Sequence, residues 1–222
     1  MTFRLQPVGG MCNRLQAMVS YLATHGSLDV WWDDSVPHFL TVFDPLPGVT
    51  FVQGGGFVDY GIPVEAPTDW RKGYAALRPI APILERVAAF RGTLGADYLA
   101  LHVRRTDMTP LAARVGQALP SDADFWAWTD ARPGPLCWLA TDNGQTQDRY
   151  LDRDSRIRFA VKLHNPEHVR DHADHPPVGP LSDAVVDLWM CVGAADWMGS
   201  GAFGTFSNTI RILRDLKGET SR

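Results

Sequence analysis

The sequence has few cysteines, no surplus of positive charge and no long apolar run, and each absence excludes a class of protein. Its three cysteines are odd in number and widely spaced, which fits reduced, buried thiols better than a disulfide framework. The formal net charge of -4 at pH 7 argues against general nucleic-acid binding. No stretch approaches the roughly 20 apolar residues of a membrane span, and the N-terminus lacks a signal-peptide pattern, so we expect a cytoplasmic protein that does not bind membranes.

Short apolar runs alternate with segments of helical periodicity, which predicts an α/β fold with parallel sheets covered on both sides. Two such series are separated near residue 92, so the simplest interpretation is two similar domains, residues 1–92 and 93–222. Strands are predicted at 3–8, 28–32, 49–53, 97–103, 136–140, 156–161 and 197–200. Helices are predicted at 13–24, 79–90, 122–129, 145–151, 183–196 and 207–216.

The most informative motif is His-Val-Arg-Arg-Thr-Asp at residues 102–107, directly after the apolar run 98–101. Open α/β folds bind phosphates at the carboxyl edge of the sheet. Arginine suits this task because its planar fork donates two parallel hydrogen bonds and stays charged. We expect Arg104 and Arg105 to face opposite ways, with a salt bridge to Asp107 or another acid as the alternative role for either. The motif indicates a nucleotide-handling enzyme.

Two carboxylates are candidate ligands for a nucleoside. Asp142 follows the next predicted strand of the second domain, where it could accept hydrogen bonds from a guanine edge or from ribose hydroxyls, or could instead cap the following helix. Asp187 lies in an otherwise apolar helix, so its charge needs a partner. Contact with a base and a place on a polar helix face both remain open for Asp187.

Two further segments place backbone N–H groups at the start of a helix. Gly10 lies between a predicted strand and helix, where glycine allows close approach to a ligand, and Asn13 could contact that ligand or cap the helix. Before the last helix, Thr205 and Ser207 supply hydroxyls suited to a diphosphate, with ordinary helix capping as the alternative. The four histidines between residues 164 and 175 favour an exposed loop or lid over a zinc site.

Taken in order, these motifs resemble those of the fucosyltransferase superfamily, which includes core α-1,6-fucosyltransferases, nodulation fucosyltransferases and protein O-fucosyltransferases. Residues 102–107 are similar to its arginine motif in the α-1,6 form, and residues 139–142, 187–207 and 9–14 to its second motif, C-terminal motif and glycine-rich loop. The resemblance implies a GT-B fold, with two Rossmann-like domains whose parallel sheets face each other across a cleft. It also implies a GDP-sugar donor, fucose above all, bound mainly by the C-terminal half, and inversion at the sugar carbon without a metal or other cofactor.

The same resemblance implies roles for individual residues. Arg104 would bind the β-phosphate of the donor as the central catalytic group. His102 and Asp187 would meet guanine, and Asp142 would contact the base or ribose. The remaining donor-binding set comprises Arg105, Thr205, Phe206, Ser207, Gly10 and Asn13.

The sequence departs from the α-1,6 branch beyond the arginine motif. That branch has a lysine and then a glutamate near the reacting sugar, and residues 108–113 contain neither. Attack by an acceptor hydroxyl benefits from a general base, so that role would fall to Asp107, which we favour, to Asp33 or Asp34, or to no residue. The acceptor stays open among a glycan, a peptide, a small metabolite and a modified nucleobase.

Two other functions compete with a sugar transferase. The order of strand, glycines, helix, strand and Asp33 approximates an NAD-binding fingerprint, although the third glycine is missing. The missing glutamate also fits a non-catalytic protein that binds a nucleotide sugar or a glycan.

Overall fold

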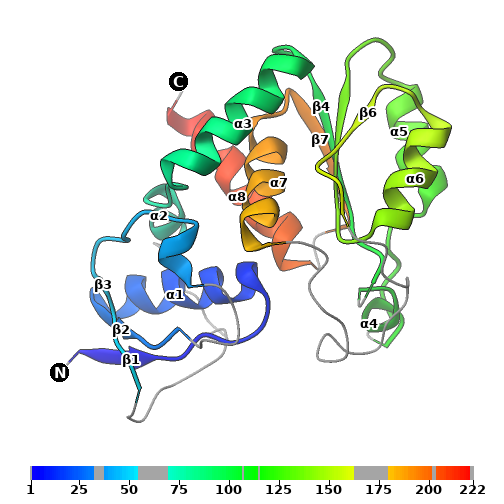
Figure 1. The fold of residues 1–222 in the computed structure, drawn as a ribbon. Coiled ribbons are helices and arrows are strands. Elements are labelled where there is room, and N and C mark those ends of the chain that lie inside the picture. The colour runs from blue at the N-terminus through cyan, green and yellow to red at the C-terminus, as the bar shows by residue number, and fades with distance from the viewer. Residues whose placement is uncertain are drawn as a thin grey trace. The chain divides into compact units, whose positions relative to one another are not determined.

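Two parallel β-sheets, each with its own helices, organise the chain in the computed structural model (Figure 1). The structure describes residues 2–32, 38–54, 70–106, 108–114, 116–162, 180–201 and 204–220. One compact unit comprises Met1–Ile83 together with Arg211–Arg222, and the other comprises Leu84–Ile210. The predicted boundary between residues 92 and 93 differs from this division, in which the C-terminal residues group with the first unit.

The first unit contains a three-stranded sheet in the order β1-β2-β3. Its elements are β1 (Phe3–Leu5), α1 (Met11–His25), β2 (Leu28–Val30), the 3-10 helix η1 (Phe39–Thr41), β3 (Val49–Phe51) and α2 (Trp70–Ala75). The apolar face predicted for α1 is present, since Leu15, Met18 and Val19 are fully buried. Helix α2 packs closely on α1, because a Cβ atom at Gly73 would lie 2.7 Å from the Cβ of Val19.

The second unit contains a four-stranded sheet in the order β6-β5-β4-β7, with every neighbouring pair parallel. Its strands are β4 (Leu99–Val103), β5 (Cys137–Thr141), β6 (Ile157–Arg158) and β7 (Asp196–Gly199). Its helices are α4 (Met108–Arg114), α5 (Asp122–Asp130), α6 (Gly144–Arg153) and α7 (Leu181–Gly193). Helices α3 (Ala81–Leu94) and α8 (Thr205–Thr220) contain residues of both units.

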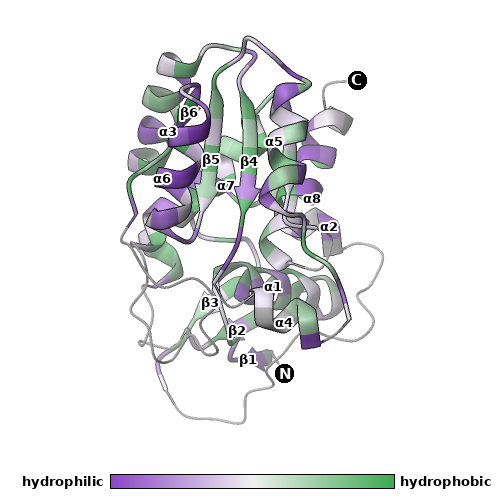
Figure 2. Cartoon of the chain, turned by 90° about the vertical axis from the view of Figure 1, so that its right-hand side faces the viewer, coloured by the Kyte–Doolittle hydropathy of each residue, from purple (hydrophilic) through white to green (hydrophobic). Residues whose placement is uncertain are grey.

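The two central strands of the second unit are buried on both faces, and Figure 2 shows their hydrophobic colour between flanking helices. Because side chains alternate along a strand, the odd-numbered apolar residues of β4 and β5 join a core cluster with Phe125 of α5 and Tyr150 of α6. Even-numbered residues face the other way: Trp138 contacts Asp187 of α7 and Phe90 of α3. This alternation decides which face each residue of the arginine motif reaches.

The α/β fold class with parallel sheets is confirmed, and all seven predicted strands are present, several of them shorter than predicted. The prediction missed α2, α4 and η1. Ser121 caps α5, with a reciprocal hydrogen bond between its backbone N–H and Asp124. All three cysteines are free and buried. No helix in the described part of the chain is long and apolar enough to cross a membrane.

Candidate functional site

The two arginines that follow β4 diverge, as expected from the alternation of the strand. Arg104 continues the side of His102, whereas Arg105 continues the side of Val103 and lies over the ring of Phe125, 5.5 Å from its centroid. The Arg104 side chain is 25% exposed and the Arg105 side chain only 10%. Of the two arginines, Arg104 is therefore the one with substantial access to solvent.

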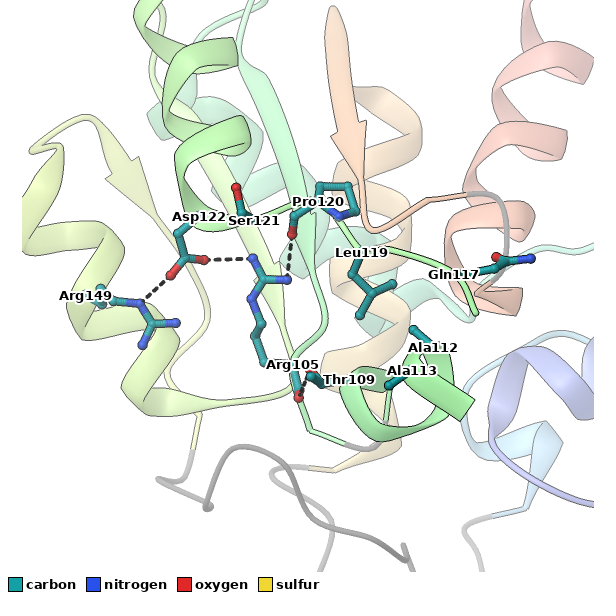
Figure 3. Close-up of a pocket in the computed structure, with 10 residues that line it drawn as sticks. All are labelled: Arg105, Thr109, Ala112, Ala113, Gln117, Leu119, Pro120, Ser121, Asp122 and Arg149. Carbon is teal, nitrogen blue, oxygen red and sulfur yellow. Dashed lines mark hydrogen bonds and ion pairs between the residues drawn. The ribbon is translucent and has the colours of Figure 1, made fainter. Parts of the chain in front are cut away.

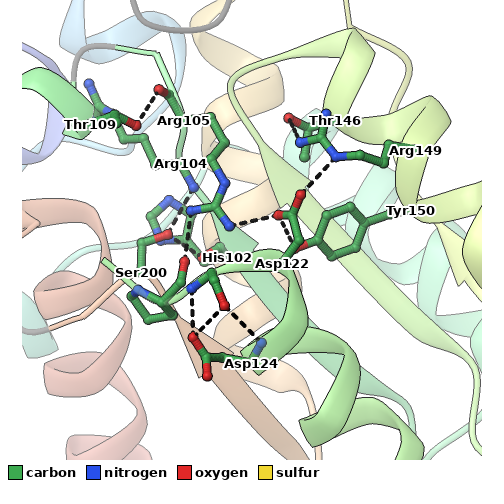
Figure 4. Close-up of polar contacts among 12 residues, drawn as sticks. His102, Arg104, Arg105, Thr109, Asp122, Asp124, Thr146, Arg149, Tyr150 and Ser200 are labelled. Atoms are coloured by element: carbon green, nitrogen blue, oxygen red, sulfur yellow. Dashed lines mark hydrogen bonds and ion pairs between the residues drawn. The ribbon is translucent and has the colours of Figure 1, made fainter. Parts of the chain in front are cut away.

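Arg104 is held from the ends of both neighbouring strands. Its backbone N–H donates to Ser200 Oγ at 2.8 Å, and the same hydroxyl donates to the carbonyl of His102 at 2.8 Å (Figure 4). Its Nε lies 3.6 Å from Oδ2 of Asp142. Ser200 directly follows β7 and Asp142 directly follows β5, so the parallel sheet brings both side chains to the end of β4.

Asp142 binds the turn after β4 through several hydrogen bonds. Its Oδ1 accepts from the backbone N–H of Arg105 at 3.2 Å, and its Oδ2 accepts from the backbone N–H of Thr106 at 3.4 Å and from the Thr106 hydroxyl. The helix-capping alternative for Asp142 is not realised. Instead, Asn143 is the N-cap of α6 and accepts from the N–H of Thr146.

The Arg105 guanidinium belongs to a partly buried polar network (Figure 4). It donates to Asp122 Oδ1 at 2.7 Å and to the carbonyl of Pro120 at 2.9 Å, and Asp122 also accepts from Arg149 and Tyr150. Burial alone would raise the pKa of Asp122, but hydrogen bonds from Arg105 and Tyr150 hold that pKa below its usual value. The alternative of an internal salt bridge is thus realised for Arg105, with Asp122 as the acid.

His102, Phe206 and Ser207 meet at the start of α8. The imidazole stacks on Phe206 with 4.5 Å between ring centroids, and its Nδ1 lies 2.8 Å from Ser207 Oγ. Burial, followed by the positive charge of Arg104, lowers the pKa of His102 to about 3. The imidazole is therefore neutral near pH 7 and offers one N–H donor and one acceptor. Helix α8 begins at Thr205, so the predicted residues Thr205, Phe206 and Ser207 lie in one helical turn.

Asp187 has buried partners of its own. Its Oδ1 accepts from the indole N–H of Trp138 at 3.1 Å, and its Oδ2 lies 3.0 Å from Lys162 Nζ. Burial raises the pKa of Asp187 to about 6, although Lys162 and Trp138 act in the opposite direction. The expectation that this carboxylate needs a partner is confirmed, while its contact with guanine stays a prediction.

The turn between β1 and α1 has a strict glycine requirement at one position. Gly9 has a φ of +84°, and a Cβ atom there would lie 2.9 Å from Nδ2 of Asn13. Gly10 is the N-cap of α1, and a Cβ atom at this position would meet no other atom within 4 Å. Asn13 lies inside α1, so it does not cap the helix.

A pocket of about 620 Å³ lies beside α4 and α5 of the second unit (Figure 3). Its polar wall is the Arg105, Asp122 and Arg149 network, and its apolar wall includes Ala112 and Leu119. Both guanidiniums of this wall share one carboxylate, Asp122. Arg104, His102 and Ser207 are not among the lining residues.

Several predicted residues lie outside the described residues: Asp107, Asp33, Asp34 and the histidines at 164, 168, 172 and 175. Within the described ranges, no group of three or more His, Cys, Asp or Glu side chains is arranged to hold a metal ion. Ser200, which directly follows β7, and Lys162, which lies beyond β6, were not predicted. Ser200 could have been found from its place directly after a strand, whereas nothing in the sequence marks Lys162 as the partner of Asp187.

Comparisons with known proteins give matches in structure only. No family model matches the sequence, and no curated protein matches it. The fucosyltransferase NodZ from Bradyrhizobium is similar with a TM-score of 0.64 and 14% identity, over 96% of this chain and 94% of that chain. A NodZ alpha-1,6-fucosyltransferase soaked with GDP-fucose has a TM-score of 0.63 and 13% identity, over 96% and 93% of the two chains. POFUT1 in complex with GDP has a TM-score of 0.63 and 12% identity, over 98% and 96%. The chain therefore has the fold of these fucosyltransferases.

Proposed function

We propose that this protein is a glycosyltransferase that moves a sugar from a GDP-sugar to an acceptor hydroxyl, with fucose as the sugar. The observation that carries the proposal is Arg104, a partly exposed guanidinium held from both sides at the carboxyl edge of a parallel sheet. Ligands of open α/β sheets bind at this edge. The similar structures support the donor class, since they include complexes with GDP-fucose and GDP.

Charge development explains how Arg104 would act. When the acceptor oxygen attacks the anomeric carbon, the bond from that carbon to the β-phosphate oxygen breaks, and the electron pair stays on GDP. A prepositioned guanidinium stabilises this growing negative charge more strongly than it stabilises the intact donor. The acceptor proton would pass to a general base, for which Asp107 is our candidate. Attack from the opposite face would invert the sugar carbon.

Neutral groups near Arg104 suit the nucleoside part of the donor. The His102 imidazole is uncharged near pH 7, and because Nδ1 is hydrogen-bonded to Ser207, Nε2 is the nitrogen that would meet the base. We include Phe206 and Thr205 in the donor site, and Gly10 and Asn13 stay predictions from the resemblance. Arg105 is the weakest member of the predicted set, because its guanidinium is committed to Asp122.

Thermal unfolding with separate nucleotides tests the donor class. A ligand that binds only the native state stabilises it by about 2.7 kcal/mol at 100 times its dissociation constant. We expect GDP to raise the melting temperature more than UDP, ADP or NAD at equal concentration. A larger shift with NAD would contradict the proposal and favour an oxidoreductase.

Transfer itself separates an enzyme from a binding protein. GDP release from GDP-fucose is measured with and without candidate acceptors. Release that depends on an acceptor supports the transferase. Tight binding of GDP-fucose with no release under any condition would favour the non-catalytic alternative.

A further inference from the structure

The end of β4 is fixed by the two strands beside it. Val103 pairs with Thr141 across the β4–β5 ladder, so the next residues, Arg104 and Asp142, leave the sheet side by side. On the other side, the Ser200 hydroxyl bridges the His102 carbonyl and the Arg104 N–H. The backbone that carries the Arg104 guanidinium is thus restrained before any ligand arrives.

Asp142 contacts both the backbone of the turn after β4 and the side chain of Arg104. Both of its oxygens accept hydrogen bonds from the turn, Oδ1 from the Arg105 N–H and Oδ2 from Thr106, and Oδ2 also lies 3.6 Å from the Arg104 Nε in an ion pair. A carboxylate that accepts this set of donors is committed to the protein. Its negative charge also offsets part of the cost of holding Arg104 partly desolvated.

We propose that Asp142 is a positioning residue that aims Arg104 at the diphosphate of the donor, and that it does not contact the base or the ribose. This inference rests on the proposed function for the identity of the ligand. Asp142 acts in two ways: it accepts hydrogen bonds from the backbone N–H groups of Arg105 and Thr106, which fixes the turn that carries Arg104, and it lies at ion-pair distance, 3.6 Å, from the Arg104 Nε. Orientation matters because the strength of bidentate phosphate binding depends on the direction of the fork.

The affinity ratio between GDP and GMP reports on this role. The two ligands share base and ribose and differ by the β-phosphate. The ratio therefore isolates the affinity that comes from contacts with the β-phosphate, including the proposed contact with Arg104. Calorimetric titration gives both dissociation constants for the wild type, Arg104→Ala, Asp142→Asn and the double variant. Loss of a charged hydrogen bond reduces affinity by about tenfold or more, so we expect Arg104→Ala to lower the ratio by about tenfold.

If Asp142 positions Arg104, Asp142→Asn lowers the same ratio, leaves GMP affinity unchanged and has no further effect in the Arg104→Ala background. An Asp142→Asn variant that weakens GDP and GMP equally would overturn the inference, because this pattern requires contact with the base or ribose. Thr106→Val is a milder second variant, since it removes one donor to Asp142 without changing the charge. It should lower the ratio in the same direction by a smaller factor.

Asp130→Asn is the matched control, because Asp130 pairs with Arg153 on an exposed surface. Its GDP to GMP ratio should equal that of the wild type. If the wild type binds GDP more tightly than GMP but transfers no sugar, the proposed function is contradicted. The inference that Asp142 positions Arg104 for binding the diphosphate is then still supported. A wild type that binds GDP no better than GMP contradicts both.

Discussion

Arg104 and Arg105 show how one residue step changes the role of a side chain. Both follow the same buried strand, yet one pairs with Asp142 at the strand ends and the other enters the core beside Phe125. The cause is the alternation of β4. Sequence alone predicted that the two would diverge, but the partner of Arg105, Asp122 at the start of α5, is set by tertiary packing and could not be predicted.

Gly9, before α1, gives a test at the scale of one residue. Gly9→Ala should reduce the free energy of unfolding by about 1–2 kcal/mol, because an L-residue at positive φ is strained and its Cβ atom would meet Asn13. Gly92→Ala is the control, since Gly92 lies inside α3, its φ is not positive and the space beside it is open. Urea denaturation measures both variants. Equal losses in the two would contradict this turn geometry.

At the scale of elements, the strands and long helices were predictable and the short helices were not. β4 and β5 are recognisable because both faces are buried, which produces continuous apolar runs. Helices α2 and α4 have only 6 and 7 residues, too few to show an apolar period. Pro110 also obscured α4, although proline is tolerated in a first helical turn.

The candidate site was predictable to the extent that strand ends gather in a parallel sheet. Arg104, His102 and Asp142 could be placed together from the order of strands. The role of Asp142 could not, because it depends on hydrogen bonds to the backbone of Arg105 and Thr106. The pairing of Asp187 with Lys162 links residues far apart in the sequence and leaves no local pattern.

The network that joins α5, α6 and the turn after β4 gives a test at this scale. Asp122→Ala removes the acceptor of Arg105, Arg149 and Tyr150. We expect the free energy of unfolding to fall by about 2–4 kcal/mol, because buried donors lose their partner. Asp130→Ala, which removes an exposed carboxylate, should cost no more than about 1 kcal/mol. Similar values for the two variants in urea denaturation would show that the network contributes little.

At the scale of the whole molecule, the last helix belongs to both compact units. Residues up to Ile210 group with the second unit, and residues from Arg211 group with the first. The sequence suggested two consecutive domains because its two series of strands and helices follow one another. Nothing in the composition of the residues from Arg211 onward indicates that they group with the first unit. The predicted boundaries therefore did not contain this division.

The pH dependence of folding offers a test that involves the entire fold. His102 has a pKa of about 3 in the folded state against 6.5 in the unfolded chain. Its contribution to stability is therefore present above pH 6.5 and is lost as pH falls toward 3, by at most about 1.4 kcal/mol per pH unit. Asp187 acts in the opposite sense between pH 3.8 and 6, because its folded pKa is raised.

A His102→Gln variant separates these two contributions. The difference in unfolding free energy between wild type and variant should be largest above pH 6.5 and shrink steadily toward acid, as measured by urea denaturation from about pH 7.5 to about pH 4. The contribution from Asp187 is common to both proteins and cancels. A difference that does not change with pH would show that His102 is not held neutral in the fold.

The proposed role of Arg104 is tested by the rate of GDP release from GDP-fucose in the presence of an acceptor that the wild type uses. Arg104→Ala should lower this rate by about 100- to 1000-fold while the protein stays folded, because it removes the charge that stabilises the departing diphosphate. Arg153→Ala, an exposed arginine paired with Asp130, should leave the rate unchanged. Turnover by a folded Arg104→Ala variant at the wild-type rate would contradict the account.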